Sequence, residues 1–135
     1  MDIKTLSAEL HTRGIRPTQQ RLAVLSYLRA HPIHPTADDI YTALLPTHPA
    51  LSKTTVYNAL NALVAAGAAR EVTIDPHEQR FDGNPDDHGH FRCTSCGKLY
   101  DFPCPTALLQ TAVPPGFRAD IRDLYLSGLC PECQP

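Results

Sequence analysis

The sequence has no apolar run long enough to cross a bilayer, and its first residues, MDIKTLSAEL, lack the basic-then-apolar order of a secretion signal. It also has no glycine-rich phosphate loop and no nucleophile motif. These absences argue against a membrane protein, a secreted protein and an enzyme. We therefore expect a cytoplasmic protein without catalytic activity, whose 135 residues form one domain of common size or two small ones.

Charge is scarce, with a net value of −2, but it is unevenly distributed. Residues 1–70 hold seven Lys and Arg against four Asp and Glu, whereas residues 71–135 hold five against ten. A mildly basic half followed by an acidic half indicates two domains with different partners.

The first half has the periodicity and the capping residues of helices. Apolar residues recur at helical spacing in four stretches, 5–14, 17–31, 36–45 and 51–67. Thr36 and Ser52 are natural N-caps, and Gly14 and Gly67 can end the helices that precede them. The stretches AAREVTI and QRFD, on either side of an Asp-Pro turn, predict two short strands. Helices followed by a two-stranded hairpin are typical of a winged helix-turn-helix.

The fourth predicted helix has a polar face that carries little charge. Its side chains are Lys53, Thr54, Tyr57, Asn58 and Asn61. Asn, Thr and Tyr can hydrogen-bond to base edges, whereas a purely solvated face would carry more Glu and Lys. One interpretation is therefore a DNA-reading helix, with Arg21 and Lys53 at phosphates. The other is an ordinary helical domain with a polar face.

Four of the five cysteines form two Cys-x-x-Cys pairs with 33 residues between them, Cys93, Cys96, Cys130 and Cys133. Four thiolates at such spacing are typical of a tetrahedral zinc site with no open position, which is structural. Four buried thiols or two disulfides are the alternatives. Cys104 has no partner at the right spacing, so we expect it to be a bystander.

The stretch DDHGHFRCTSC places a His-x-His directly ahead of the first cysteine pair. One metal could take both histidines and both cysteines, or two metals could lie side by side. If zinc takes the four cysteines, His88 and His90 can bind a second ion, with Asp82 before them and Asp101 after them. In a strand both imidazoles would point to the same side. Nitrogen and carboxylate ligands favour Fe²⁺, Mn²⁺ or Zn²⁺. Surface histidines, or a catalytic iron site like those of non-haem oxygenases, are the alternatives.

Six motifs together resemble the ferric uptake regulator family over the whole chain: TQQR, HPTADDIY, SKTTVYNAL, RFD, HGHFRCTSCGK and CPEC. The resemblance implies an α+β protein, with a winged helix-turn-helix DNA-binding domain at residues 1–83. It implies a small α/β dimerisation and metal-binding domain with the four-cysteine zinc at residues 84–135. The implied function is a metal-dependent transcriptional repressor, a homodimer that binds a palindromic operator.

The resemblance also implies a fifth regulatory ligand, His34, so that Fe²⁺ or Mn²⁺ is held by His34, Asp82, His88, His90 and Asp101. His34 precedes Pro35, which disfavours helix, and we expect its backbone to be extended.

The type of regulator is indicated by the same ligands. Asp at both carboxylate positions resembles the peroxide-responsive repressors, which points to His34 and His88 as the residues that iron and peroxide oxidise. An iron- or manganese-uptake repressor without peroxide sensing is the alternative. Asp87, Gly89 and Arg122 stand where a third metal site of the iron regulators would have ligands, so no third site is expected.

Overall fold

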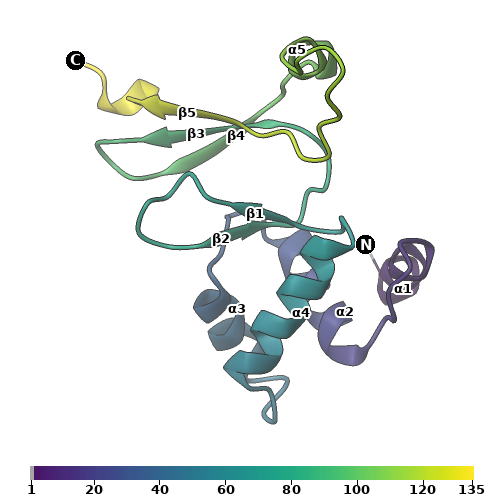
Figure 1. The fold of residues 1–135 in the computed structure, drawn as a ribbon. Coiled ribbons are helices and arrows are strands. Elements are labelled where there is room, and N and C mark those ends of the chain that lie inside the picture. The colour runs from purple at the N-terminus through teal and green to yellow at the C-terminus, as the bar shows by residue number, and fades with distance from the viewer. Residues whose placement is uncertain (1) are drawn as a thin grey trace. The chain divides into compact units, whose positions relative to one another are not determined.

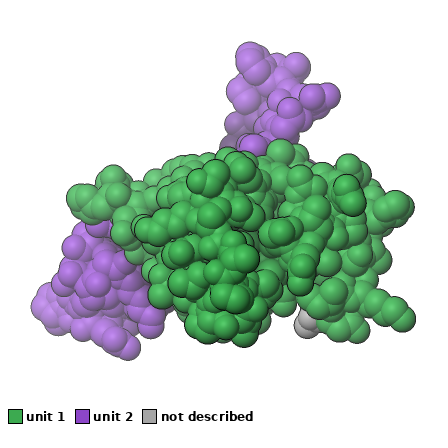
Figure 2. Space-filling view, turned by 90° about the horizontal axis from the view of Figure 1, so that it is seen from below, with its two compact units in different colours: residues 1–85 green, residues 86–135 purple. Residues whose placement is uncertain are grey.

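The chain divides into two compact units, residues 1–85 and 86–135, which Figure 2 colours green and purple. The structure is a computed structural model that describes residues 2–135, with the side chain of Thr106 excepted. Within that range none of the helices has the length and the apolar character needed to cross a membrane.

The first unit consists of four helices followed by a hairpin (Figure 1). Its elements are α1 (Ile3–Thr12), α2 (Gln19–Ala30), α3 (Ala37–Leu44), α4 (Lys53–Ala65), β1 (Arg70–Val72) and β2 (Arg80–Asp82). The two strands are antiparallel, and Arg70 lies opposite Asp82. This is the winged helix-turn-helix that the sequence predicts, with the loop between β1 and β2 as its wing.

Helix boundaries in this unit follow side-chain N-caps, of which Thr36 and Ser52 were predicted. The side chains of Thr18, Thr36 and Ser52 accept hydrogen bonds from the backbone N–H three residues on, at 3.3, 3.1 and 3.1 Å. Each such cap contributes about 1 kcal/mol by satisfying an N–H group that has no partner within the helix. Gly14 and Gly67 follow α1 and α4 with φ of 82° and 76°, a conformation that glycine adopts without steric cost.

The core of the first unit is an apolar cluster to which all four helices and β2 contribute. Its fully buried members include Leu6, Leu10, Val24, Leu25, Leu28, Ile40, Val56, Leu60, Leu63 and Phe81. Because α4 turns its apolar side chains into this cluster, its polar side chains are left on the surface.

An ion pair between Glu9 and Arg29 links α1 to α2. Arg29 donates from both terminal nitrogens to the carboxylate of Glu9, at 2.9 and 2.7 Å, and Arg13 Nε donates to the same carboxylate at 2.9 Å. The hydrogen bonds from Arg29, and then those from Arg13, hold the pKa of Glu9 below its ordinary value of 4.5. The ionised form is therefore stabilised by folding.

We expect Glu9→Gln to lower the free energy of unfolding by about 1 kcal/mol at pH 7, because it removes a charge-assisted pair that is mostly shielded from water. A depressed folded pKa gives stability that is present above the unfolded pKa and lost as pH falls through the folded pKa. The difference from wild type should therefore shrink below about pH 4. Denaturant unfolding at pH 7 and pH 3.5 measures it, with Glu71→Gln, an exposed carboxylate on β1, as control. An equal loss at both pH values would contradict the assignment.

The second unit is built on a three-stranded sheet in the order β4-β3-β5 (Figure 1). Its elements are β3 (Gly89–Cys93), β4 (Leu99–Phe102), α5 (Thr106–Thr111), β5 (Leu124–Gly128) and a 3₁₀ turn, η1 (Pro131–Cys133). The central strand β3 is antiparallel to β4 and parallel to β5. A parallel pair needs a long crossover connection, and the segment that contains α5 supplies it.

Candidate metal centres

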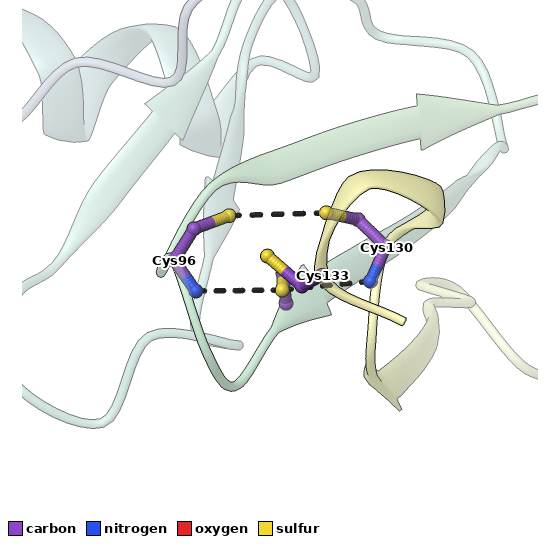
Figure 3. A group of neighbouring side chains, drawn as sticks. Cys96, Cys130 and Cys133 are labelled. Atoms are coloured by element: carbon purple, nitrogen blue, oxygen red, sulfur yellow. Dashed lines mark hydrogen bonds between the residues drawn. The ribbon is translucent and has the colours of Figure 1, made fainter. Parts of the chain in front are cut away.

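The two cysteine pairs meet because β3 and β5 are parallel and in register. Cys93, the last residue of β3, lies opposite Gly128, the last residue of β5. The carboxyl ends of parallel strands share one edge of a sheet, so the turn after β3 and the η1 turn after β5 come together there. This edge carries Cys93 at the end of β3, Cys96 from the turn that follows it, and Cys130 and Cys133 from the other turn. Figure 3 labels Cys96, Cys130 and Cys133.

The spacing of the four sulfurs fits a tetrahedral ion. All four Sγ atoms lie within 4.8 Å of one another, and those of Cys96 and Cys130 are 3.9 Å apart. Four sulfurs at the usual Zn–S bond length from a tetrahedral zinc ion lie about 3.8 Å from one another. All five cysteines are free thiols, so the structure does not show the alternative of two disulfides.

Hydrogen bonds already favour thiolate at part of this site. The backbone N–H groups of Cys96 and Cys130 both donate to Cys93 Sγ at 3.5 Å, which lowers the pKa of Cys93 to about 6. A hydrogen bond from the Tyr100 hydroxyl, first among several causes, lowers the pKa of Cys130. Cys133 retains its proton, because its hydrogen bond to Cys130 raises its pKa to about 12. A divalent ion would displace that proton on binding.

Cys104, in the segment between β4 and α5, does not belong to this group. Its sulfur lies 4.0 Å from the Pro105 carbonyl oxygen, and the residue is half-buried. The structure therefore places it apart from the four cysteines.

In the second unit two histidines converge on one carboxylate. His90 on β3 lies opposite Asp101 on β4, and its Nε2 is 3.3 Å from Asp101 Oδ1. His88 precedes β3 by one residue, and its Nε2 is 3.7 Å from the same oxygen. The two rings lie 4.4 Å apart, so both imidazoles are on one side of the chain. His88 and His90 are 6% and 1% exposed, which sets them apart from surface histidines.

Neighbouring groups orient these imidazoles. His88 Nδ1 lies 2.7 Å from the Asp86 carbonyl oxygen, which can only accept a hydrogen bond. The proton of a neutral His88 is therefore on Nδ1, and Nε2 carries the lone pair that a metal needs. The Tyr125 ring packs edge-on against His90, with centroids 5.7 Å apart. Gly89 separates the histidines because a Cβ there would lie 2.2 Å from the Phe102 ring.

The first unit carries a second His-Asp pair. His34 Nε2 lies 3.9 Å from Asp82 Oδ2, and each residue is 4% exposed. The other oxygen, Asp82 Oδ1, accepts from the Asn84 backbone N–H at 2.9 Å. This bond directs Oδ2 toward the imidazole.

The prediction of an extended backbone at His34 is wrong. Its φ is 56°, in the left-handed region, which costs a residue other than glycine about 1–2 kcal/mol. The chain turns here so that the Pro35 carbonyl can accept from the Phe81 backbone N–H at 3.0 Å. Arg80 Nη1 donates to the His34 carbonyl at 3.0 Å. The bias that a following proline exerts is thus overridden by contacts with β2.

Position 122, one of the positions where a third metal site would have a ligand, carries a cation. Arg122 Nη2 lies 3.0 Å from Asp87 Oδ2, and the two side chains are 30% and 21% exposed. The Asp87 carboxylate, one residue before His88, is thereby neutralised by a guanidinium.

All five polar side chains predicted for the reading face of α4 are exposed. They are Lys53, Thr54, Tyr57, Asn58 and Asn61. Lys53 Nζ lies 3.5 Å from Asp38 Oδ1 and 5.7 Å from the centroid of the Tyr41 ring. Arg21, in the first turn of α2, is half-buried and donates to the Arg16 carbonyl at 2.9 Å.

Three side chains that contact the predicted ligands were not predicted themselves. Tyr100 donates to Cys130, Tyr125 packs on His90, and Arg80 donates to the His34 carbonyl. Arg80 lies in the RFD motif, yet nothing in that motif indicates a contact with a residue 46 positions away.

Comparison with known proteins decides the family. The model of the ferric uptake regulator family matches residues 12–112. The chain belongs to the ferric uptake regulator family. Members of this family are transcriptional regulators.

Individual relatives cover nearly the whole chain. The peroxide-responsive repressor PerR of Staphylococcus aureus is 39% identical over 132 residues, which are 94% of this chain and 88% of that protein. A structure of PerR from Streptococcus pyogenes, concerned with peroxide sensing and gene regulation, has 32% identity and a TM-score of 0.55 over 98% of this chain and 92% of its own. The ferric uptake regulator of Pseudomonas aeruginosa, solved with manganese, has 25% identity and a TM-score of 0.74 over 92% of this chain and 96% of its own. The predicted α+β class and the resemblance to this family are confirmed.

Proposed function

We propose that this regulator is a metal-dependent repressor that binds a palindromic operator as a homodimer and releases it in response to peroxide. Residues 1–83 bind DNA, and residues 84–135 dimerise and bind metal. The observation that carries the proposal is a pair of His-Asp groups whose imidazoles are all buried, His34 with Asp82 in one unit and His88 with His90 and Asp101 in the other.

These two groups together hold one regulatory Fe²⁺ or Mn²⁺. Three imidazoles and two carboxylates form a donor set that suits these ions better than a thiolate site would. Neither group alone offers more than three side chains, so neither fills the coordination shell of such an ion. Because the ligands come from both domains, metal binding couples the domains and thereby controls the spacing of the two reading helices in the dimer. The four cysteines hold a structural Zn²⁺ in each chain.

Aspartate at both carboxylate positions, Asp82 and Asp101, supports peroxide sensing, because it resembles the peroxide-responsive repressors. When bound by these ligands, Fe²⁺ would supply the electron that reduces peroxide, whereas Mn²⁺ would not readily do so. One-electron reduction of peroxide would give hydroxide and a hydroxyl-like oxidant, which would add its oxygen to His34 or His88 before it diffuses away. The second electron and the proton that the ring loses would pass to Fe³⁺ and hydroxide. An oxidised imidazole is a poorer nitrogen ligand. Loss of His34 removes one of the two ligands in the DNA-binding domain, which uncouples the domains and releases the operator.

The exposed face of α4 reads the operator. Tyr57 and Asn58 contact bases, Thr54 and Asn61 lie beside them, and Arg21 and Lys53 contact phosphates. Lys53 and Asp38 are 59% and 65% exposed, and a surface pair of this kind contributes little stability. Lys53 can therefore exchange Asp38 for a phosphate at small cost.

We expect the Mn²⁺-loaded protein to bind a palindromic duplex tightly and the protein without regulatory metal to bind it weakly.

Tyr57→Ala should weaken operator binding by about 10- to 100-fold and relax sequence preference, because a base contact is lost. Arg21→Ala should weaken binding to all sequences and lower the slope of log K against log salt by about one. Fluorescence anisotropy over a salt series measures both.

Gln110→Ala, an exposed position on α5, is the control and should match wild type. If Tyr57→Ala binds the operator as tightly as wild type, the assignment of α4 to the DNA interface is wrong. Equal binding with and without regulatory metal would remove the metal dependence.

A further inference from the structure

His34 has the only positive φ among the non-glycine residues of positions 2–135, at 56°. It is also the proposed ligand from the first unit, and it is almost fully buried. A strained backbone persists only where surrounding contacts hold it, and such positions cluster at functional sites. The contacts that hold the His34 backbone therefore help to set the position of its imidazole.

Arg80 makes the contact that bears directly on this backbone. Its Nη1 donates to the His34 carbonyl at 3.0 Å. The same guanidinium is anchored on the wing, since Nε donates to Asp75 Oδ2 at 2.9 Å and Nη2 lies 3.2 Å from Glu78 Oε2. Asp75 is itself held by the His77 backbone N–H at 2.9 Å. The planar fork of an arginine can make these bonds at once, which a lysine cannot do.

Strand β2 thus holds His34 at two points. Arg80 and Asp82 are two residues apart on this strand, so their side chains leave the same side of it. Arg80 reaches the carbonyl of His34, and Asp82 lies 3.9 Å from its imidazole. Between them the Phe81 backbone N–H donates to the Pro35 carbonyl.

We propose that Arg80 is a positioning residue for the regulatory metal, which holds His34 through its carbonyl in the left-handed conformation that sets its imidazole beside Asp82. This inference rests on the proposed function, in which His34 is a ligand. It adds a link from the wing to the metal site, because Asp75, the better shielded of the two acidic partners of Arg80, lies in the loop between β1 and β2.

The test is the affinity of the full-length, zinc-loaded protein for Mn²⁺, measured by isothermal titration calorimetry without DNA. Arg80→Ala should bind Mn²⁺ about 10- to 100-fold more weakly than wild type, the usual effect of removing a residue that orients a ligand. Arg80→Lys should lie between the two, since it keeps the charge but not the fork. Glu78→Gln removes the charge of an exposed partner of Arg80 and leaves the bond to His34, so it should stay within about twofold of wild type.

A double-mutant cycle separates positioning from general destabilisation. If Arg80 acts through His34, then Arg80→Ala should weaken Mn²⁺ binding no further in a His34→Ala background. A purely structural role would weaken it in both backgrounds. If Arg80→Ala does not fold, the same cycle is run with Arg80→Lys.

The possible results distinguish this inference from the proposed function. An Arg80 variant that binds Mn²⁺ within about twofold of wild type, while His34→Ala binds weakly, overturns the inference alone. An equal loss in both backgrounds overturns it too. If His34→Ala binds Mn²⁺ as tightly as wild type, the proposed ligand set is wrong and the inference falls with it.

Discussion

Replacing Cys96 or Cys130 with serine is expected to release the zinc and to disrupt the homodimer. The two residues come from different turns, so either substitution leaves the ends of β3 and β5 without their shared ion. A structural zinc contributes on the order of 10 kcal/mol to folding, more than the whole stability of many domains of this size. Elemental analysis for zinc and light scattering for mass give the two readouts.

Cys104→Ser is the matched control, because Cys104 lies outside the four-cysteine group. It should keep one zinc per chain and remain a dimer. If Cys96→Ser or Cys130→Ser also keeps one equivalent of zinc and stays a stable dimer, the structural assignment is wrong.

Brief peroxide treatment should add one oxygen to His34 or His88 in the iron-loaded protein and to neither in the manganese-loaded protein. The reason is that only iron supplies the electron at a site these imidazoles line. Trypsin should give one peptide that spans residues 30–53 and another that spans residues 81–92, so each target is on a separate peptide. Mass spectrometry with fragmentation then locates the oxygen.

The same peptides provide controls. His31 and His48 lie on the first peptide and are absent from both proposed ligand groups, so they should stay unmodified. Release of DNA with both His34 and His88 intact, and with the zinc cysteines oxidised instead, would make the zinc site the sensor and end this mechanism. If peroxide releases no DNA, either through oxidation of His34 or His88 or through oxidation of the zinc cysteines, the result would favour the alternative, a metal-uptake repressor.

Asp101→Glu tests the carboxylate in the same assay. Asp101 Oδ1 lies 3.7 Å from His88 Nε2 and 3.3 Å from His90 Nε2, so one oxygen serves both imidazoles. A side chain longer by one methylene still offers a carboxylate but changes how the iron is held. We expect metal-dependent DNA binding to persist and the peroxide response to be blunted. An unchanged yield of oxidised His34 and His88 would contradict this.

The helices of the first unit were predictable because their signals are local. Thr18, Thr36 and Ser52 sit three residues before the N–H groups that they accept from, so sequence alone indicates where α2, α3 and α4 begin. The hairpin was predictable for the same reason, since its strands flank an Asp-Pro turn.

The backbone of His34 shows where local signals fail. Pro35 disfavours helix at the residue before it, which suggested an extended conformation. The φ of 56° depends instead on Arg80, which is 46 residues away in the chain, and on the pairing of Pro35 with Phe81. The sequence contains no sign of either contact.

By itself the sequence determined which ligand types are present and how they are spaced: two cysteine pairs, a His-x-His, and aspartates before and after it. Only the tertiary structure decided which of them meet. The register of β3 with β5 brings Cys93 level with Gly128 and so joins the cysteine pairs, and the register of β3 with β4 sets His90 opposite Asp101. Strand register depends on backbone hydrogen bonds between distant segments and on the side chains that pack across them.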